Sequence, residues 1–338
     1  MAMITKSDIL LSIRNLVVEY SSEGDTVHAV NCVELDLEKG KTLGLVGETG
    51  AGKTTIAKAI LQILPEPQGK ITDGEICFDT ENLMQFSEKQ MRKIRGNKIS
   101  MIFQDPMTAL NPTMRIGDQI AEAIGLHSDF TKKEAKIRAA EMLEKVGIPA
   151  GRYADYPHQF SGGMKQRVII AIALACSPQV LLADEPTSAL DVTIQAQVLD
   201  MIIDLKEKLG MALIMITHDL GVVAKICDSV AIMYAGKIVE YGTLREIFRE
   251  PKHPYTEGLF NSLPNVKDRK VDLKPIPGFM PDPTKLPLGC SFAPRCQYAV
   301  EDCEAPSEMY TFSETHTVLC TRYSEADFKI ERVFSKTR

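Results

Sequence analysis

The chain has 338 residues, 44% hydrophobic and 25% charged, which is enough for two or three domains with a sizeable core. Its formal net charge of −6 provides no electrostatic footprint for nucleic acid, so we expect no such partner. The longest apolar run extends only from Val168 to Cys176, whereas a membrane-spanning helix needs about 20 such residues. The N-terminus also lacks the apolar core of a signal peptide, which predicts a cytoplasmic chain with reduced cysteines.

The first part of the chain predicts β structure between residues 11 and 38. Apolar and acidic residues alternate from Val33 to Glu38, which is the two-residue period of a half-buried strand. A glycine-rich turn follows within Thr42–Thr55 and leads into an amphipathic segment, Ile56–Leu64, before two prolines. Another short strand is expected at Glu75–Phe78.

The glycine-rich turn has the pattern Gly47-x4-Gly52-Lys53-Thr54, which is the P-loop pattern in the strand–loop–helix context that it requires. Its glycines let backbone N–H groups approach a polyphosphate, and the following helix presents its positive end. Lys53 would reach the β/γ-phosphates, and the Thr54 hydroxyl would bind Mg²⁺. A chance glycine turn is the alternative, but both flanks fit the motif. The predicted nucleotide-binding residues are Gly47, Glu48, Thr49, Gly50, Ala51, Gly52, Lys53, Thr54 and Thr55.

Residues 83–160 change to a helical character. Isoleucines recur four apart within Met114–Leu126, on one helix face. Thr131 and Glu134 form a capping box, and the apolar stripe that follows stops at Gly147. We therefore expect an all-helical insertion in this part of the chain.

Three later segments predict a buried sheet. Val180–Ala183, Ala212–Ile216 and Val230–Met233 are near-continuous apolar runs, which are typical of parallel strands covered on both faces. A helical pattern from Ile194 to Leu205, closed by Gly210, separates the first two runs. This alternation predicts a doubly wound α/β sheet.

Polar side chains directly follow the predicted strands. Asp184 is placed to hold Mg²⁺, and Glu185 could polarise the attacking water. Capping of the next helix is the alternative role for this acidic pair. His218 would sit beside the γ-phosphate, and Gln104 offers an amide oxygen to Mg²⁺ or to water. A structural histidine and a solvated glutamine are the alternatives, so both assignments depend on the other motifs.

A second anion site is predicted where Ser161-Gly162-Gly163 precedes the apolar run Val168–Cys176. Small residues there expose the N-terminus of a helix far from the P-loop in sequence. One nucleotide cannot readily use both sites unless two chains meet. The pattern thus suggests a head-to-tail dimer, with nucleotide between the P-loop of one chain and Ser161–Gly163 of the other.

In order and spacing, these motifs resemble those of the nucleotide-binding subunits of ABC transporters over residues 10 to about 245. Walker A corresponds to Gly47–Thr54, Walker B to Val180–Glu185 and the signature to Ser161–Gly163. The resemblance also implies that Tyr20 stacks on adenine, and it implies an ATPase core with an N-terminal antiparallel β subdomain. The remaining motifs are the Q-loop at Gln104, the D-loop at Ser188–Asp191 and the switch histidine His218.

The signature departs from the family wording Leu-Ser-Gly-Gly-Gln, because this chain has Phe160 and Met164 at its two ends. Ser161 and Gly163, which face the phosphate in the family, are kept. The change at Met164 removes a polar contact, so it bears on the fine geometry of the partner's site.

Finer wording at Phe103–Pro112, Tyr156–Met164 and His253–Thr256 resembles the peptide and nickel importers. The resemblance implies an ATPase subunit that powers uptake of dipeptides or oligopeptides, with nickel as the alternative. It also implies a second ATPase subunit in a heterodimer, two membrane permease subunits and an external peptide-binding protein. The chain would then lie at the cytoplasmic face of the membrane. A soluble ABC ATPase is less favoured, because those usually carry two cassettes or a long coiled-coil insertion.

The composition changes again beyond residue 250. Ten of the 18 prolines lie between Pro251 and Pro306, which predicts a loop-rich appendage. Four thiols in such a segment suggest a metal that replaces a hydrophobic core, and their spacing alone does not separate Zn²⁺ from a [4Fe–4S] cluster. Some peptide importers carry an iron–sulfur cluster at similar cysteines, so the resemblance implies [4Fe–4S], with Zn²⁺ or unligated thiols as alternatives. His316 is either an alternative ligand or, as we expect, a surface histidine. The predicted ligands are Cys290, Cys296, Cys303 and Cys320.

These patterns divide the chain into four predicted parts. Residues 1–82 hold the β subdomain and the P-loop part of the ATPase core, and residues 83–160 hold the helical subdomain. Residues 161–250 complete the core, and residues 251–338 form the proline-rich domain with the four-cysteine site.

Overall fold

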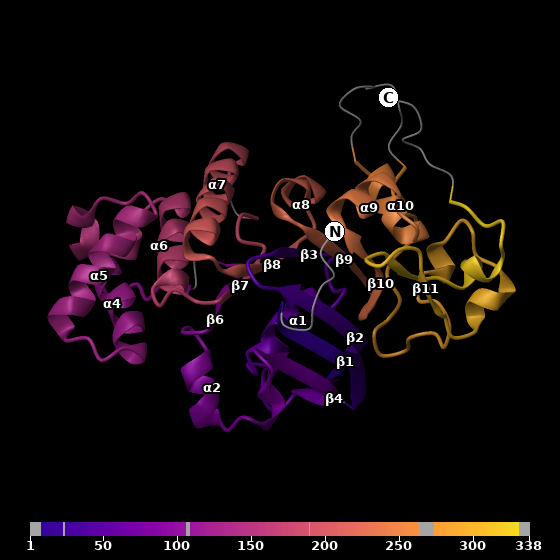
Figure 1. The fold of residues 1–338 in the computed structure, drawn as a ribbon, viewed down its shortest axis with the longest axis horizontal. Helices are drawn as coiled ribbons and strands as arrows, with labels where there is room; N and C mark the ends of the chain where they lie inside the picture. Colours follow the sequence, from indigo (N-terminus) through magenta and orange to yellow (C-terminus); the bar gives the residue numbers. More distant parts are fainter. Residues whose placement is uncertain (1–7, 23, 106–108, 189, 264–273, 331–338) are drawn as a thin grey trace.

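The computed structural model describes residues 8–22, 24–105, 109–188, 190–263 and 274–330, which contain two sheets (Figure 1). The smaller sheet has four strands in the order β2-β1-β4-β5, and the larger has eight in the order β11-β12-β10-β9-β3-β8-β7-β6. Helices α4 and α5 lie at one end of the long axis, and the C-terminal segment lies at the other (Figure 1).

The smaller sheet is antiparallel throughout. The alternation predicted for its second strand is confirmed, because Val33, Leu35 and Leu37 are buried while Glu34 is exposed. The strand expected at residues 75–78 is longer than predicted and begins at Gly69. Its strands are β1 (Ile9–Ser22), β2 (Asp25–Glu38), β4 (Gly69–Phe78) and β5 (Glu81–Asn82).

The larger sheet has a parallel centre, as the apolar runs predict. Every residue of β3, β7 and β8 is buried, which explains why these strands show no alternation. The parallel strands are β3 (Thr42–Val46), β6 (Ile99–Ile102), β7 (Val180–Asp184), β8 (Ala212–Thr217) and β9 (Ser229–Tyr234). The antiparallel strand β10 (Lys237–Thr243) then pairs with β9.

Two predicted helix caps are confirmed. Thr131 forms the expected capping box with Glu134, and Gly210 closes α7 in the left-handed conformation with φ +64°. The helix after the P-loop begins at Lys53 and ends at Ile60, before the prolines. The helices of this core are α1 (Lys53–Ile60), α2 (Glu88–Ile94), α4 (Ile116–His127), α5 (Lys132–Lys145), α6 (Gly162–Leu174), α7 (Val192–Leu209) and α8 (Leu220–Ile226).

The expectation that residues 83–160 are entirely helical is wrong. Strand β6 lies inside this stretch and pairs in parallel with β7, so the insertion proper starts only after Ile102. An apolar run of four residues is too short to show whether its hydrophobic period is that of a strand or of a helix. The helix α2 just before it favoured the prediction of a helix. The division of the chain into four parts stays a prediction.

The C-terminal part is joined to the larger sheet. It contains α9 (Leu244–Arg249) and α10 (Pro254–Asn261), and the short strands β11 (Met309–Thr311) and β12 (Thr317–Leu319) extend the sheet beyond β10. Between residues 274 and 308 the described chain forms only 3₁₀ turns and loops, as its prolines predict.

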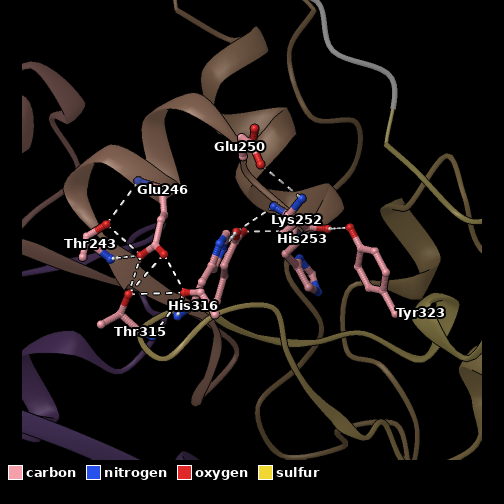
Figure 2. Close-up of polar contacts among 10 residues, drawn as sticks. Thr243, Glu246, Glu250, Lys252, His253, Thr315, His316 and Tyr323 are labelled. Carbon is pink, nitrogen blue, oxygen red and sulfur yellow. Dashed lines mark hydrogen bonds and ion pairs between the residues drawn. The ribbon is translucent and has the colours of Figure 1, made fainter. Parts of the chain in front are cut away.

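A buried polar cluster fastens the C-terminal part to β10 (Figure 2). The fully buried Glu240 carboxylate accepts hydrogen bonds from the backbone N–H groups of Lys252 (2.6 Å) and His253 (2.9 Å), and it contacts Nε2 of His316 at 2.7 Å. Nearby, Glu246 of α9 accepts hydrogen bonds from the Thr315 hydroxyl at 2.9 and 3.1 Å. His316 is only 3% exposed and is engaged by Glu240, so the expectation of a surface histidine is wrong.

Candidate nucleotide-binding site

The predicted site lies at the carboxyl edge of the parallel strands. The P-loop follows β3, and the chain segments that carry Gln104, Glu185 and His218 follow β6, β7 and β8. Since these strands are neighbours in the sheet, their ends bring the four segments together (Figure 1). The carboxyl edge is also where open α/β sheets bind ligands.

Two glycines allow the P-loop to lie tightly against neighbouring backbone. A Cβ atom on Gly47 would collide with the carbonyl oxygen of Met233, and one on Gly52 would collide with that of Ala29. Gly52 also has φ +104°, a conformation that L side chains rarely adopt. A side chain at either position would force the loop away from these carbonyls.

Lys53 is folded into the loop. Its Nζ donates hydrogen bonds to the carbonyl oxygens of Gly47 and Glu48, both at 2.8 Å, and its side chain is buried. Burial lowers the pKa of Lys53, and the negative charges of Glu185, Asp184 and Glu48 partly oppose that shift. A polyphosphate in the loop can take over the contacts that these carbonyls now make.

Asp184 and Thr54 present neighbouring oxygen atoms. The Thr54 hydroxyl donates to Oδ1 of Asp184 at 3.1 Å, and the Asp184 side chain is 2% exposed. Burial, with a smaller contribution from the charge of Glu185, raises the pKa of Asp184 above its ordinary value. A buried carboxylate beside a hydroxyl is a suitable ligand pair for Mg²⁺, which prefers oxygen ligands.

Glu185 has contacts with both of the other predicted residues. Its Oε2 accepts a hydrogen bond from Nε2 of Gln104 at 2.9 Å, and its Oε1 lies 2.9 Å from Nδ1 of His218. Glu185 has φ +45°, which is uncommon outside glycine, and its backbone N–H is bonded to the carbonyl of Ile216 at 2.9 Å. This strained position points the carboxylate toward the residues that end the neighbouring strands.

Comparisons with known proteins decide the family. The family described as "ABC transporter" matches residues 30–188, and the one described as "Oligopeptide/dipeptide transporter, C-terminal region" matches residues 239–303. The dipeptide transport ATP-binding protein DppD of Bacillus subtilis is 50% identical over 314 residues, which cover 92% of this chain and 94% of that protein. The chain belongs to the ABC transporter family. The oligopeptide transport ATP-binding protein OppD of the same species is 50% identical over 313 residues, covering 91% of this chain and 87% of that one.

Solved structures agree with this ABC assignment. A dimeric ATP-binding cassette in a post-hydrolysis state, bound to ADP and Pi, aligns with a TM-score of 0.63 at 26% identity over 70% of this chain and 99% of that chain. The cassette cbiO1 from Clostridium perfringens aligns with a TM-score of 0.61 at 28% identity over 72% and 92%. The predictions of an ABC ATPase fold and of ATPase activity are confirmed. No helix within the described ranges combines the length and apolar character needed to cross a bilayer.

Tyr20 lies next to the start of α1 in this ABC ATPase. Its hydroxyl is 3.4 Å from the hydroxyl of Thr55, and its ring packs against Gly69, where a Cβ atom would be too close. This places the ring beside the P-loop, and its stacking on adenine stays a prediction.

The signature residues line a separate groove of about 790 Å³. Ser161 caps α6 by accepting a hydrogen bond from the N–H of Met164 at 3.4 Å, and the groove continues along Leu190 and Asp191 to Ile194 of α7. Its lining includes no P-loop residue among the described positions, and the binding of a partner's nucleotide in this groove stays a prediction. Two predicted segments are described only in part, because Pro106, Met107, Thr108 and Ala189 lie outside the described residues.

The four late cysteines are free thiols, and the backbone N–H of Cys290 donates to the carbonyl oxygen of Cys303 at 2.8 Å. Burial, followed by the charges of Cys290, Cys296 and Cys303, raises the pKa of Cys320 to about 12. The N–H of Tyr298 donates to Sγ of Cys296 at 3.4 Å. Even so, the described part of the chain contains no group of three or more His, Cys, Asp or Glu side chains arranged to hold a metal ion. The predicted cluster therefore has no metal site to support it directly.

Two further neighbours of the P-loop could not be found from sequence motifs. Tyr255 of α10 and Arg295, in a 3₁₀ turn at Ala293–Arg295, both contact Glu48. Neither residue belongs to a local motif, and more than 200 positions separate each from the loop, so only the folded chain brings them there.

Proposed function

We propose that this ABC ATPase powers a membrane importer for dipeptides or oligopeptides. The observation that carries the proposal is that Lys53, Asp184, Glu185 and His218 meet at one edge of the sheet, which supports ATP hydrolysis at that edge. The match of residues 239–303 to the oligopeptide/dipeptide transporter region, and the names of the relatives that are 50% identical, support peptides as the solute.

ATP would bind with its adenine on Tyr20 and its phosphates in the loop Gly47–Thr55. Mg²⁺ would take oxygen ligands from Thr54 and Asp184, with Gln104 completing its surroundings. Lys53 would then exchange its two backbone carbonyl contacts for the β- and γ-phosphates.

Hydrolysis would require a water molecule in line with the γ-phosphate. Glu185 orients or deprotonates that water, and the charges of Lys53 and Mg²⁺ stabilise the transition state. His218 and Gln104 contact the Glu185 carboxylate from two sides, at 2.9 Å each, and these contacts would set its direction.

A second ATPase subunit would complete the site with its own signature loop. Ser161–Gly163 of this chain would in turn cover the nucleotide of that partner, in a heterodimer. Closure of the pair moves α4 and α5, and the surface near Gln104–Asn111 passes the movement to two permease subunits. The chain would thus act as a peripheral subunit at the cytoplasmic face of the membrane, and an external binding protein would deliver the peptide.

The four late cysteines would hold a [4Fe–4S] cluster, with Zn²⁺ as the alternative. Four thiolates around one Zn²⁺ lie about 3.8 Å apart, given Zn–S bonds of about 2.3 Å at tetrahedral angles. No such group occurs among the described side chains, although the charges of Cys290, Cys296 and Cys303 add to the effect of burial in raising the pKa of Cys320. The preference for [4Fe–4S] over Zn²⁺ therefore rests on the resemblance of these cysteines to those of peptide importers that carry such a cluster. The N–H groups of Phe292 and Ala293 at Cys290, and that of Tyr298 at Cys296, suit cluster sulfurs. The group would supply a structural cross-link to the loop-rich segment.

Peptide uptake tests this proposal. The complete transporter would be reconstituted in vesicles with ATP inside, and uptake of labelled dipeptide, longer peptide and Ni²⁺ would be measured. We expect peptide uptake that is lost with Glu185→Gln and kept with Glu207→Gln, an exposed glutamate on α7. Uptake of Ni²⁺ but of no peptide would contradict the proposed solute.

A further inference from the structure

The C-terminal part of the chain contacts the P-loop directly. Nη1 of Arg295 donates to Oε2 of Glu48 at 3.0 Å and to the hydroxyl of Tyr234 at 3.2 Å. The backbone N–H of Glu48 donates to the hydroxyl of Tyr255 at 2.9 Å. Both the side chain and the backbone of one P-loop residue are therefore held by residues from outside the ATPase motifs.

Arg295 is held firmly in place. Its side chain is 7% exposed, and its Nε donates to the carbonyl oxygen of Pro277 at 2.8 Å. The rings of Tyr234, Tyr255 and Phe292 pack against one another with centroid separations of 4.7 to 5.4 Å, and Cζ of Arg295 lies 5.8 Å from the centroid of the Tyr234 ring. Burial alone lowers the pKa of Arg295, but its hydrogen bonds to Glu48 and Tyr234 raise it above the ordinary value, so the guanidinium stays charged.

Glu48 poses an electrostatic problem for a loop that binds an anion. Its carboxylate is close enough to Lys53 to influence the pKa of that residue. Asp184 and Glu185 act on Lys53 in the same way, so Glu48 is a third acidic side chain at the site. A third unpaired negative charge would repel a polyphosphate. The guanidinium of Arg295 compensates this charge at short range and in a partly buried setting, where such a pair is only weakly screened.

We propose that Arg295 is a positioning residue for ATP binding, which acts on the P-loop through Glu48. The C-terminal segment neutralises the Glu48 carboxylate and fixes the loop, so that its N–H groups and Lys53 are presented to the phosphates. The inference rests on the proposed function, because it takes this loop as the phosphate site. It gives the C-terminal segment a direct part in the ATPase cycle.

A double-mutant cycle tests the proposal by equilibrium binding of Mg²⁺–ATP to the full chain. Arg295→Met leaves the Glu48 carboxylate uncompensated, and we expect the affinity to fall about five- to tenfold. Glu48→Gln removes the carboxylate and should bind at least as tightly as the wild type. The double variant Arg295→Met with Glu48→Gln should return to within about twofold of Glu48→Gln alone.

Two results would overturn the proposal. Either Arg295→Met binds ATP like the wild type, or the double variant stays as weak as Arg295→Met, which would assign the loss to packing rather than charge. Arg322→Met is the matched control, because Arg322 pairs with Glu325 in the same part of the chain and makes no hydrogen bond or ion pair with a described P-loop residue. The ATP affinity of this variant should not change. Lys53→Ala separates the two levels: if it binds ATP as well as the wild type, the proposed phosphate site itself is wrong.

Discussion

Replacing Glu240 by alanine should release the C-terminal segment from the larger sheet. Glu240 is fully buried and satisfies three donors, the N–H groups of Lys252 and His253 and Nε2 of His316. Each buried donor left without a partner costs about 1–3 kcal/mol. Three such donors predict a loss of at least about 3 kcal/mol in the free energy that holds β12 against β10.

Hydrogen–deuterium exchange measures this free energy locally, at the amides of residues 317–319 in β12. A loss of about 3 kcal/mol corresponds to about hundredfold faster exchange, because every 1.4 kcal/mol is a factor of ten. Glu240→Gln keeps one acceptor oxygen and should show a smaller increase. Glu304→Ala, at an exposed position, should leave the exchange rate unchanged. Exchange of β12 in Glu240→Ala at the wild-type rate would show that the buried cluster is not the anchor.

Three further predictions concern single sites. Burial raises the folded-state pKa of Asp184, so its contribution to stability is lost as pH rises through that pKa. Asp184→Asn should therefore raise the Tm of the nucleotide-free chain more at pH 8 than at about pH 4, close to the ordinary aspartate pKa of about 3.9. Equal Tm differences at these two pH values would contradict this. Burial lowers the pKa of His253 to about 3, below its value in the unfolded chain. The free energy of unfolding of the wild type should therefore fall as pH drops below about 6.5, and it should fall less in His253→Gln. Thermal unfolding over this pH range measures the difference. Anaerobically purified protein should hold about four irons and four sulfides per chain. Cys296→Ser should lose this iron and sulfide, and Cys176→Ser should keep both. A content of one zinc and no iron would reject the cluster.

Local patterns predicted much of the site. The P-loop, Asp184, Glu185 and His218 each directly follow a run of apolar residues, and parallel strands bring such ends together. The caps at Thr131 and Gly210 were predictable for the same reason, since a few neighbouring residues determine them.

Long-range pairings were not predictable in this way. The four residues of β6 have no period of their own, and only pairing with β7 identifies them as a strand. The carboxylate of Glu240 decides the burial of His316, which lies 76 positions away. Likewise, the sequence around Arg295 contains nothing that indicates a contact with Glu48.

Single-turnover hydrolysis of Mg²⁺–ATP tests the central claim most directly. Glu185→Gln keeps the shape of the side chain, so Gln104 and His218 still lie within hydrogen-bonding distance of it. The substitution removes the carboxylate that activates water. We predict that this variant still binds ATP while its hydrolysis rate falls at least about a hundredfold, with Glu207→Gln unchanged. Hydrolysis by Glu185→Gln at the wild-type rate would contradict the account.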